Sequence, residues 1–111
     1  PHPGDLVQGL RALEEGFIPP IFDETVLDGK IVVDSRSSFA MSKDLTQKEG
    51  LFVGISCGAV VRAAVKAAER LEGEQHIVCL LADGGWKYLS SNLWTTEWED
   101  QPDDVESKIW W

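Results

Sequence analysis

The sequence predicts an α/β fold in which helices flank a parallel β-sheet. The first observation is an alternation along the chain, because short apolar or β-branched runs at residues 30–33, 51–53 and 76–82 are separated by two longer amphipathic stretches. The second observation is that the run after His76 is apolar at every position, which is typical of a strand covered on both faces. Together these patterns predict short strands in one parallel layer, with helices packed against it.

The first strand and the first helix follow a loop-rich start. Glycines and prolines punctuate residues 1–29, and the β-branched run at residues 30–33 indicates a strand. Asp34 or Ser35 can cap the next helix, which we expect to continue through Lys48. A glycine at position 50 is the expected stop. The buried face of this helix is expected to contain Phe39, Met41 and Leu45.

The second half of the chain repeats the strand and helix pattern. Residues 51–53 indicate a short strand, residues 54–58 a turn, and residues 59–71 an amphipathic helix that ends before Gly73. The apolar stripe of this helix is expected to consist of Val60, Val61, Ala64, Ala67, Ala68 and Leu71. Its alanines would let the helix lie close to a sheet.

The last predicted strand, at residues 76–82, runs into a turn at residues 83–85 and then a short helix at residues 86–94. His76 is expected at the surface where this strand begins, and Cys79 in the core. Ligands of open α/β sheets bind beyond the carboxyl ends of the strands. The turns at residues 54–58 and 83–85 both follow strands, so we expect them to border the same crevice.

Composition limits the possible functions. The chain has 111 residues, 43% of them hydrophobic, and a formal net charge of −9. Length predicts one domain, and no apolar run approaches the roughly 20 residues that span a bilayer. An acidic chain without a basic stripe argues against nucleic-acid binding, since phosphate neutralisation supplies most of that affinity. Two cysteines give neither a metal motif nor a disulfide framework, and a reducing cytoplasm is the simplest expected location.

A glycine-flanked serine is the most informative local feature. Ser56 lies in the run Gly-Ile-Ser-Cys-Gly at residues 54–58, at the start of the second predicted helix. A hydrolase nucleophile elbow has this pattern, but it needs an acid and then a histidine afterwards, and the only later histidine is His76. The alternative is that Ser56 caps the helix while the glycines permit close packing. Cys57 is expected to be a small packing residue.

Several motifs in order make a more specific pattern. They are QGL at residues 8–10, EGFIP at 15–19, KEGLFVGISCG at 48–58 and LADGGWKYLSS at 81–91. From about Val7 to Trp94 the chain resembles the carboxyl-terminal third of the cysteine synthase and cystathionine β-synthase family, which are fold-type-II pyridoxal-phosphate (PLP) enzymes. The resemblance implies that residues 1–94 are the C-terminal part of a large PLP-binding domain. Residues 95–111 would be a tail, with six acidic residues against one lysine.

The resemblance implies roles for residues that bind the cofactor. The residue matching Ser56 hydrogen-bonds the pyridine nitrogen, and a neutral hydroxyl there favours β-elimination over transamination. Asp83 and Gly84 match the turn beside the cofactor ring, although the proline usual in that motif is absent and an ordinary strand-end turn is the alternative.

Other matching positions concern the substrate and the tail. Gly9 matches a loop glycine near the substrate, with a flexible turn as the alternative. Arg11 matches an arginine that recognises the phosphate of O-phosphoserine in the sulfur-carrier-dependent subgroup, and otherwise would be a solvated partner of the neighbouring glutamates. Trp110 and Trp111 resemble the end of that subgroup's extension, which enters the active site and meets the carrier protein. A disordered tail, or packing on the domain itself, is the alternative.

The resemblance also implies what this chain does not carry. None of its six lysines lies in the context of the family's cofactor-binding lysine, and no phosphate-binding loop is present. We therefore expect a fragment with no catalytic residue of its own, inactive alone. The intact enzyme would be a homodimer that makes L-cysteine by β-replacement on O-phosphoserine or O-acetylserine, with sulfide or a carrier-protein thiocarboxylate. The alternatives are a non-catalytic interaction module, a cystathionine β-synthase or a threonine dehydratase.

Overall fold

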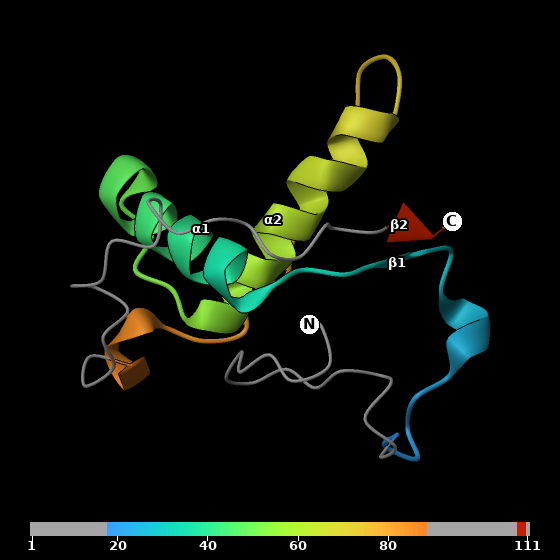
Figure 1. The fold of residues 1–111 in the computed structure, drawn as a ribbon, viewed down its shortest axis with the longest axis horizontal. Helices are drawn as coiled ribbons and strands as arrows, with labels where there is room; N and C mark the ends of the chain where they lie inside the picture. The colour runs from blue at the N-terminus through green and yellow to red at the C-terminus, as the bar shows by residue number, and fades with distance from the viewer. Residues whose placement is uncertain (1–17, 89–108, 111) are drawn as a thin grey trace.

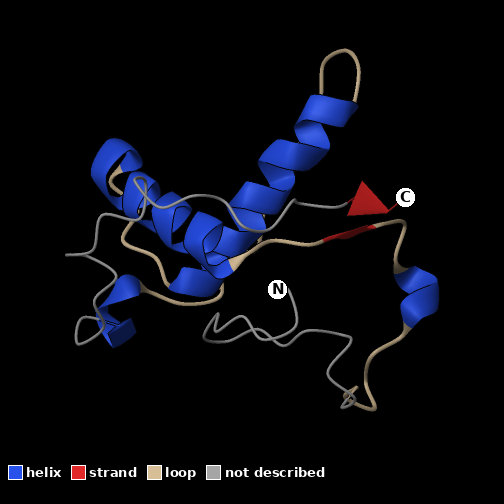
Figure 2. Cartoon of the chain, in the orientation of Figure 1, coloured by secondary structure: helices blue, strands red, loops and turns tan. Residues whose placement is uncertain are grey.

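Two helices that cross form the centre of the molecule (Figure 1). The computed structural model describes residues 18–88 and 109–110. The elements, in chain order, are the 3-10 helix η1 (Glu24–Val26), strand β1 (Lys30–Ile31), helix α1 (Ser35–Glu49), helix α2 (Ile55–Arg70), the 3-10 helix η2 (Gly85–Tyr88) and strand β2 (Ile109–Trp110). Helices account for most of the regular structure in the described residues (Figure 2).

Helix α1 has the boundaries that its cap residues predict. The Asp34 carboxylate accepts a hydrogen bond from the Ser37 N–H at 2.7 Å, so Asp34 is the N-cap. Gly50 ends the helix in the left-handed region at φ 69°, and its N–H donates to the Leu45 carbonyl. The predicted cap and stop are both confirmed. Leu45 is buried as expected, whereas Phe39 and Met41 are only partly buried.

Helix α2 begins four residues earlier than the sequence pattern indicates. Its N-cap is Gly54, and no side chain caps the first turn. Ser56 therefore lies inside the helix, and the interpretation that its hydroxyl caps the helix is wrong. At the other end α2 stops at Arg70, one residue before the predicted end at Leu71 and ahead of Gly73, as expected.

The predicted apolar stripe of α2 is wrong in its carboxyl-terminal half. Ala68 and Leu71 are exposed, and the buried residues cluster instead in the first turn and a half of the helix. The reason is tertiary, because α1 covers only the amino-terminal part of α2 and the remainder projects away from it (Figure 1). The buried members of α2 are Ile55, Ser56, Cys57, Gly58 and Ala59.

Small residues let the two helices approach closely. A Cβ atom on Gly58 would lie 2.1 Å from the Ser38 carbonyl oxygen and 2.2 Å from the Ser42 hydroxyl. Both serines are fully buried, and the Ser42 hydroxyl donates to the Gly54 carbonyl at 2.9 Å. Two apolar clusters lie beside this contact, one formed by Val33, Ile55 and Ala59 and the other by Leu45, Val53 and Cys57.

The predicted parallel sheet stays a prediction. Strand β1 pairs antiparallel with β2, with Lys30 opposite Trp110 and Ile31 opposite Ile109. The segment at residues 51–53 makes a single antiparallel bridge, from Val53 to Gly84. Within the described part of the chain, residues 76–82 form no ladder.

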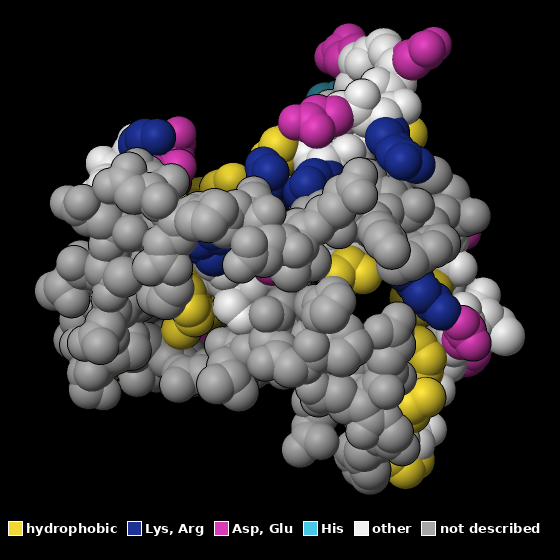
Figure 3. Space-filling model, in the orientation of Figure 1, with side chains coloured by type: hydrophobic (Ala, Val, Ile, Leu, Met, Phe, Trp, Pro, Cys, Tyr) yellow, Lys and Arg dark blue, Asp and Glu magenta, His cyan; other side chains and the backbone are white. Residues whose placement is uncertain are grey.

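The exposure of residues 76–82 differs from that of a buried strand. Val78 is 95% exposed and Leu80 is 80% exposed. The expected surface position of His76 is confirmed, whereas Cys79 is only half-buried and is not a core residue. A continuously apolar strand is buried only if other elements cover both of its faces. Hydrophobic side chains are visible at several places on the surface (Figure 3).

The predicted helix at residues 86–94 is present in part. Residues Gly85–Tyr88 form the 3-10 helix η2, and the remainder of the predicted helix lies outside the described residues. The proposed boundary between residues 94 and 95 lies there too, so that division stays a prediction. No helix in the described ranges is long and apolar enough to cross a membrane.

Candidate functional site

Ser56 occupies the first turn of α2, where backbone N–H groups have no partner within the helix. The side chain is buried, with 7% of the residue exposed. Because no side chain caps this turn, the positive end of the helix dipole is not neutralised by a capping carboxylate. A buried hydroxyl in this position can donate a hydrogen bond to a ligand atom, and the dipole favours an atom that carries negative or partial negative charge.

The turn that contains Asp83 lies directly against this helix start. The Gly54 N–H donates to the Asp83 carbonyl at 3.3 Å, and the Gly85 N–H donates to the Phe52 carbonyl at 3.1 Å. These bonds flank the bridge between Val53 and Gly84. The turns at residues 54–58 and 83–85 are therefore neighbours, and the crevice that they are expected to border stays a prediction. The structure brings the opening turn of α2, which holds Ser56, next to Asp83 and Gly84.

Cys57 adds a side-chain contact to the backbone pairing. Its sulfur lies 3.4 Å from the Asp83 carbonyl oxygen and 3.5 Å from the Asp83 Oδ1 atom. The residue is fully buried. The sequence pattern predicts a packing role alone for this cysteine and misses the contact. The available signal was its position next to Ser56 in the glycine-flanked run, but the partner lies 26 residues later in the chain.

Glycines keep the backbone of the second turn close to its neighbours. A Cβ atom on Gly85 would lie 2.6 Å from the Phe52 ring and 3.0 Å from the Val53 carbonyl oxygen. A Cβ atom on Gly84 would overlap the Trp86 ring, so the indole of Trp86 lies over the backbone of this turn. Gly84 and Gly85 are both buried. Their lack of side chains therefore keeps this turn compact beside Ser56.

The hydrolase alternative does not fit this geometry. Ser56 lies within a helix, not on a strained turn between a strand and a helix. His76 follows the loop at the opposite end of α2, where its side chain is 91% exposed beside Glu74. A 16-residue helix is about 24 Å long, so this histidine is not placed to act as a base for Ser56.

The remaining predicted site residues are Gly9, Arg11, Trp110 and Trp111. Gly9, Arg11 and Trp111 lie outside the described residues. The backbone of Trp110 pairs with Lys30 through β2. In the described part of the chain, no cluster of three or more metal-ligating side chains occurs.

Known proteins similar to this chain include cysteine synthases. No family model matches the chain. A probable cysteine synthase of Bacillus subtilis is 41% identical over 80 residues, which is 72% of this chain. The cysteine synthase of Aquifex aeolicus is 37% identical over 85% of the chain, and that of Buchnera aphidicola is 36% identical over 78%. This chain is similar to cysteine synthases.

The similarity covers only a part of those enzymes. The chain spans 26%, 30% and 28% of the lengths of the three cysteine synthases. These matches confirm the resemblance to cysteine synthases that the sequence motifs indicate. They leave the sulfur-carrier-dependent subgroup as a prediction.

Solved structures agree with the cysteine synthase matches. The crystal structure of an O-ureido-L-serine synthase is 32% identical, with a TM-score of 0.75 over 90% of this chain and 30% of that one. A mutant of that enzyme with O-ureido-L-serine bound gives a TM-score of 0.67 over 81% of this chain and 26% of that one. The arrangement of the described elements is therefore also found in O-ureido-L-serine synthase.

Proposed function

We propose that this chain is the carboxyl-terminal part of the PLP-binding domain of a cysteine synthase. The single observation that carries the proposal is the contact between the opening turn of α2, which holds Ser56, and the turn at residues 83–85. These are the two segments to which the motif resemblance assigns cofactor contacts. The similarity to cysteine synthases over most of the chain supports the same assignment.

The residues at this contact fit a pyridine ring. A ring nitrogen needs a hydrogen-bond partner, and the Ser56 hydroxyl is an uncharged donor at a helix start without a side-chain cap. The glycines at positions 84 and 85 pack against the Trp86 and Phe52 rings, which keeps their turn close to the residues that precede α2. When bound, PLP supplies electron withdrawal from the amino-acid substrate. Ser56 would leave the ring nitrogen without a proton, which limits that withdrawal and favours loss of the leaving group.

We also propose the identity of the substrate and of the sulfur donor, and these assignments rest on sequence motifs. Arg11 would bind the phosphate of O-phosphoserine with its guanidinium, and Gly9 would let the loop approach the substrate. The tail with Trp110 and Trp111 would enter the active site and meet a sulfur carrier protein. O-acetylserine and sulfide are the alternative substrates. We also propose that the intact enzyme is a homodimer, and that the lysine and the phosphate loop that hold PLP lie on sequence outside this chain.

The direct test uses the complete protein that contains this chain. We expect the purified protein to bind PLP, to absorb visible light, and to change that absorption when O-phosphoserine or O-acetylserine is added. Ser56→Asp should shift the absorption and slow elimination, because a carboxylate would hold the ring nitrogen protonated. Ser56→Thr keeps a hydroxyl and is the matched control. A complete protein that is colourless and free of PLP would refute the proposal and favour the interaction module.

The substrate assignment needs a separate experiment. In the complete protein, Arg11→Gln should raise the KM for O-phosphoserine by about tenfold to a hundredfold, since it removes a charge-assisted pair with phosphate. The KM for O-acetylserine should change little, because this ester has no phosphate group. Equal effects on both substrates would show that Arg11 does not recognise phosphate.

A further inference from the structure

The carbonyl of Asp83 is the acceptor for two donors on one helical turn. The Gly54 N–H reaches it at 3.3 Å, and the Cys57 sulfur lies 3.4 Å from the same oxygen. Gly54 is the N-cap of α2 and Cys57 is the third residue of the helix, so the two donors stand on either side of Ser56 in the sequence. A carbonyl oxygen has two lone pairs and can accept both bonds.

Packing alone does not account for the environment of Cys57. The residue does belong to an apolar cluster with Leu45 and Val53, and a buried cysteine commonly behaves as a small hydrophobic residue. Its sulfur, however, also lies near a second oxygen, the Asp83 Oδ1 atom, at 3.5 Å. A side chain without a donor would place carbon against these two oxygen atoms and lose the contacts that the thiol makes.

We propose that Cys57 is a positioning residue whose thiol ties the turn at residues 83–85 to the start of α2. The Cys57 S–H would donate to Asp83 and so fix how far that turn stands from Ser56. The consequence for PLP rests on the proposed function, which assigns cofactor contacts to Ser56 and to the turn at residues 83–85. Cys57 touches neither the ring nor the substrate in this proposal.

A serine and an alanine substitution separate the two roles of Cys57. Serine keeps a donor and loses the sulfur's volume, while alanine loses both. If Cys57 is needed only for apolar packing, Cys57→Ser should be at least as damaging as Cys57→Ala, because a buried hydroxyl is less apolar than a methyl group. If Cys57 is needed as a donor, Cys57→Ser should resemble the wild type and Cys57→Ala should not.

The test uses the complete protein. It measures how firmly the turn at residues 83–85 is held to the start of α2, and the affinity of the protein for PLP. Hydrogen exchange of the Gly54 and Gly85 amides reports on the two backbone bonds that join the turn to residues 52–54. In the PLP-free protein, Cys57→Ala should speed exchange of both amides by about twofold to fivefold, because a thiol is a weak donor and contributes less than an ordinary hydrogen bond. Its affinity for PLP should fall by a similar factor, and Cys57→Ser should lie closer to the wild type than Cys57→Ala does in both readouts.

A matched control comes from the same apolar cluster. Leu45→Val removes one methylene beside Cys57 and leaves its contact with Asp83 in place. It should lower the thermal midpoint while leaving PLP affinity unchanged. Wild-type exchange rates in Cys57→Ala, or equal losses in Cys57→Ser and Cys57→Ala, would overturn the positioning role. Failure of the wild-type protein to bind PLP would instead remove the proposed function, and the exchange rates would still decide whether Cys57 ties the turn.

Discussion

Gly58 shows how one residue sets the distance between two helices. Its backbone lies against α1, so a Cβ atom would meet the Ser38 carbonyl oxygen and the Ser42 hydroxyl at little over 2 Å. Because the position is within α2, glycine is not needed there for a left-handed backbone. The residue is glycine because of what packs against it. The same small residue lets Ser56 and Cys57 lie where the helices meet.

The variant Gly58→Ala tests this close approach. Helix propensity alone predicts a gain of up to about 1 kcal/mol, since alanine is the better helix former. We expect the opposite sign, a loss of about 1–3 kcal/mol in the free energy of unfolding, because the methyl group has no room. Urea denaturation followed by circular dichroism measures the change.

Gly50→Ala is the control for Gly58→Ala. Nothing lies within 4 Å of a Cβ atom at position 50, so its cost should come only from the positive φ of 69°, about 1 kcal/mol. A stabilised Gly58→Ala protein would contradict the packing shown here.

At the scale of elements, α1 holds the segment that leads into α2. The Ser42 hydroxyl donates to the Gly54 carbonyl at 2.9 Å, and the Thr46 hydroxyl lies 3.2 Å from the Leu51 carbonyl. These bonds join side chains of one helix to the backbone of the loop before the other. The position of Ser56 therefore depends on α1, although α1 carries none of the predicted site residues.

Two buried serines on α1 allow a matched test of whether α1 holds the loop before α2. Ser42→Ala leaves the buried Gly54 carbonyl without its side-chain donor, so we expect it to cost about 1–2 kcal/mol. Ser38 donates instead to the Asp34 carbonyl of its own helix, an arrangement that contributes little, and Ser38→Ala should cost less than about 1 kcal/mol. Thermal and urea unfolding compare the two. Similar costs would mean that the bond to Gly54 does not hold the loop.

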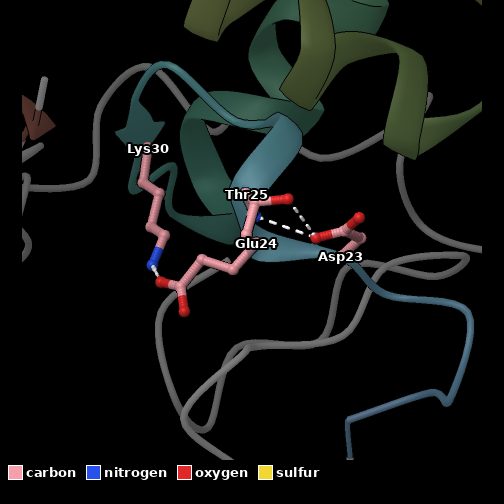
Figure 4. A network of polar contacts seen from close by, with 4 residues as sticks. All are labelled: Asp23, Glu24, Thr25 and Lys30. Atoms are coloured by element: carbon pink, nitrogen blue, oxygen red, sulfur yellow. Dashed lines mark hydrogen bonds and ion pairs between the residues drawn. The ribbon is translucent and has the colours of Figure 1, made fainter.

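The 3-10 helix η1 has a pH-dependent cap. The hydroxyl and the N–H of Thr25 both donate to the Asp23 carboxylate, at 2.6 and 3.0 Å, and these bonds hold the pKa of Asp23 below its ordinary value of 3.8 (Figure 4). A depressed carboxyl pKa contributes stability that is complete above pH 3.8 and is lost as the pH falls through the folded-state pKa. Nearby, Lys30 pairs with Glu24.

We expect the Asp23 resonance to titrate below pH 3.8, and η1 to loosen over the same range of pH. Thr25→Ala removes the hydroxyl donor and should move this pKa up toward its ordinary value. Carbon-detected NMR of the Asp23 carboxyl measures this pKa in the wild type and in the variant. An unchanged Asp23 pKa in the variant would show that the Thr25 hydroxyl is not the cause.

At the scale of the whole molecule, the described residues leave an apolar segment uncovered. Residues 76–82 are apolar but largely exposed, and the core of the described residues consists of two small clusters between α1, α2 and the adjoining segments. If this segment becomes the predicted strand, other chain segments must cover both of its faces. The cysteine synthases that this chain matches are more than three times as long as the matched part.

The variant Val78→Lys tests whether residues 76–82 become a buried strand in the complete protein. If the predicted parallel sheet forms, lysine at this position would be buried without a partner, and the complete protein should fail to fold or lose several kcal/mol. Glu72→Lys, in the exposed loop after α2, is the control and should change stability by less than about 0.5 kcal/mol. Equal tolerance of both substitutions, measured by soluble yield and thermal midpoint, would show that the predicted sheet is wrong.

The sequence by itself determined the features that are encoded locally. Asp34 and Gly50 fixed the limits of α1, because caps act on the backbone within a few residues. The ordered motifs at residues 48–58 and 81–91 also indicated the relation to cysteine synthases, since they do not depend on knowing what packs against them.

Only the tertiary structure decided how the site is built. The start of α2 at Ile55, the burial of its first turn, and the contact of Cys57 with Asp83 all depend on segments distant in the chain. Periodicity misplaced the buried face of α2 because a helix buries the side that a neighbour covers, and α1 covers only its beginning. Contacts between distant segments carry no local signal, so the contact between the opening turn of α2 and residues 83–85 could be read only from the folded chain.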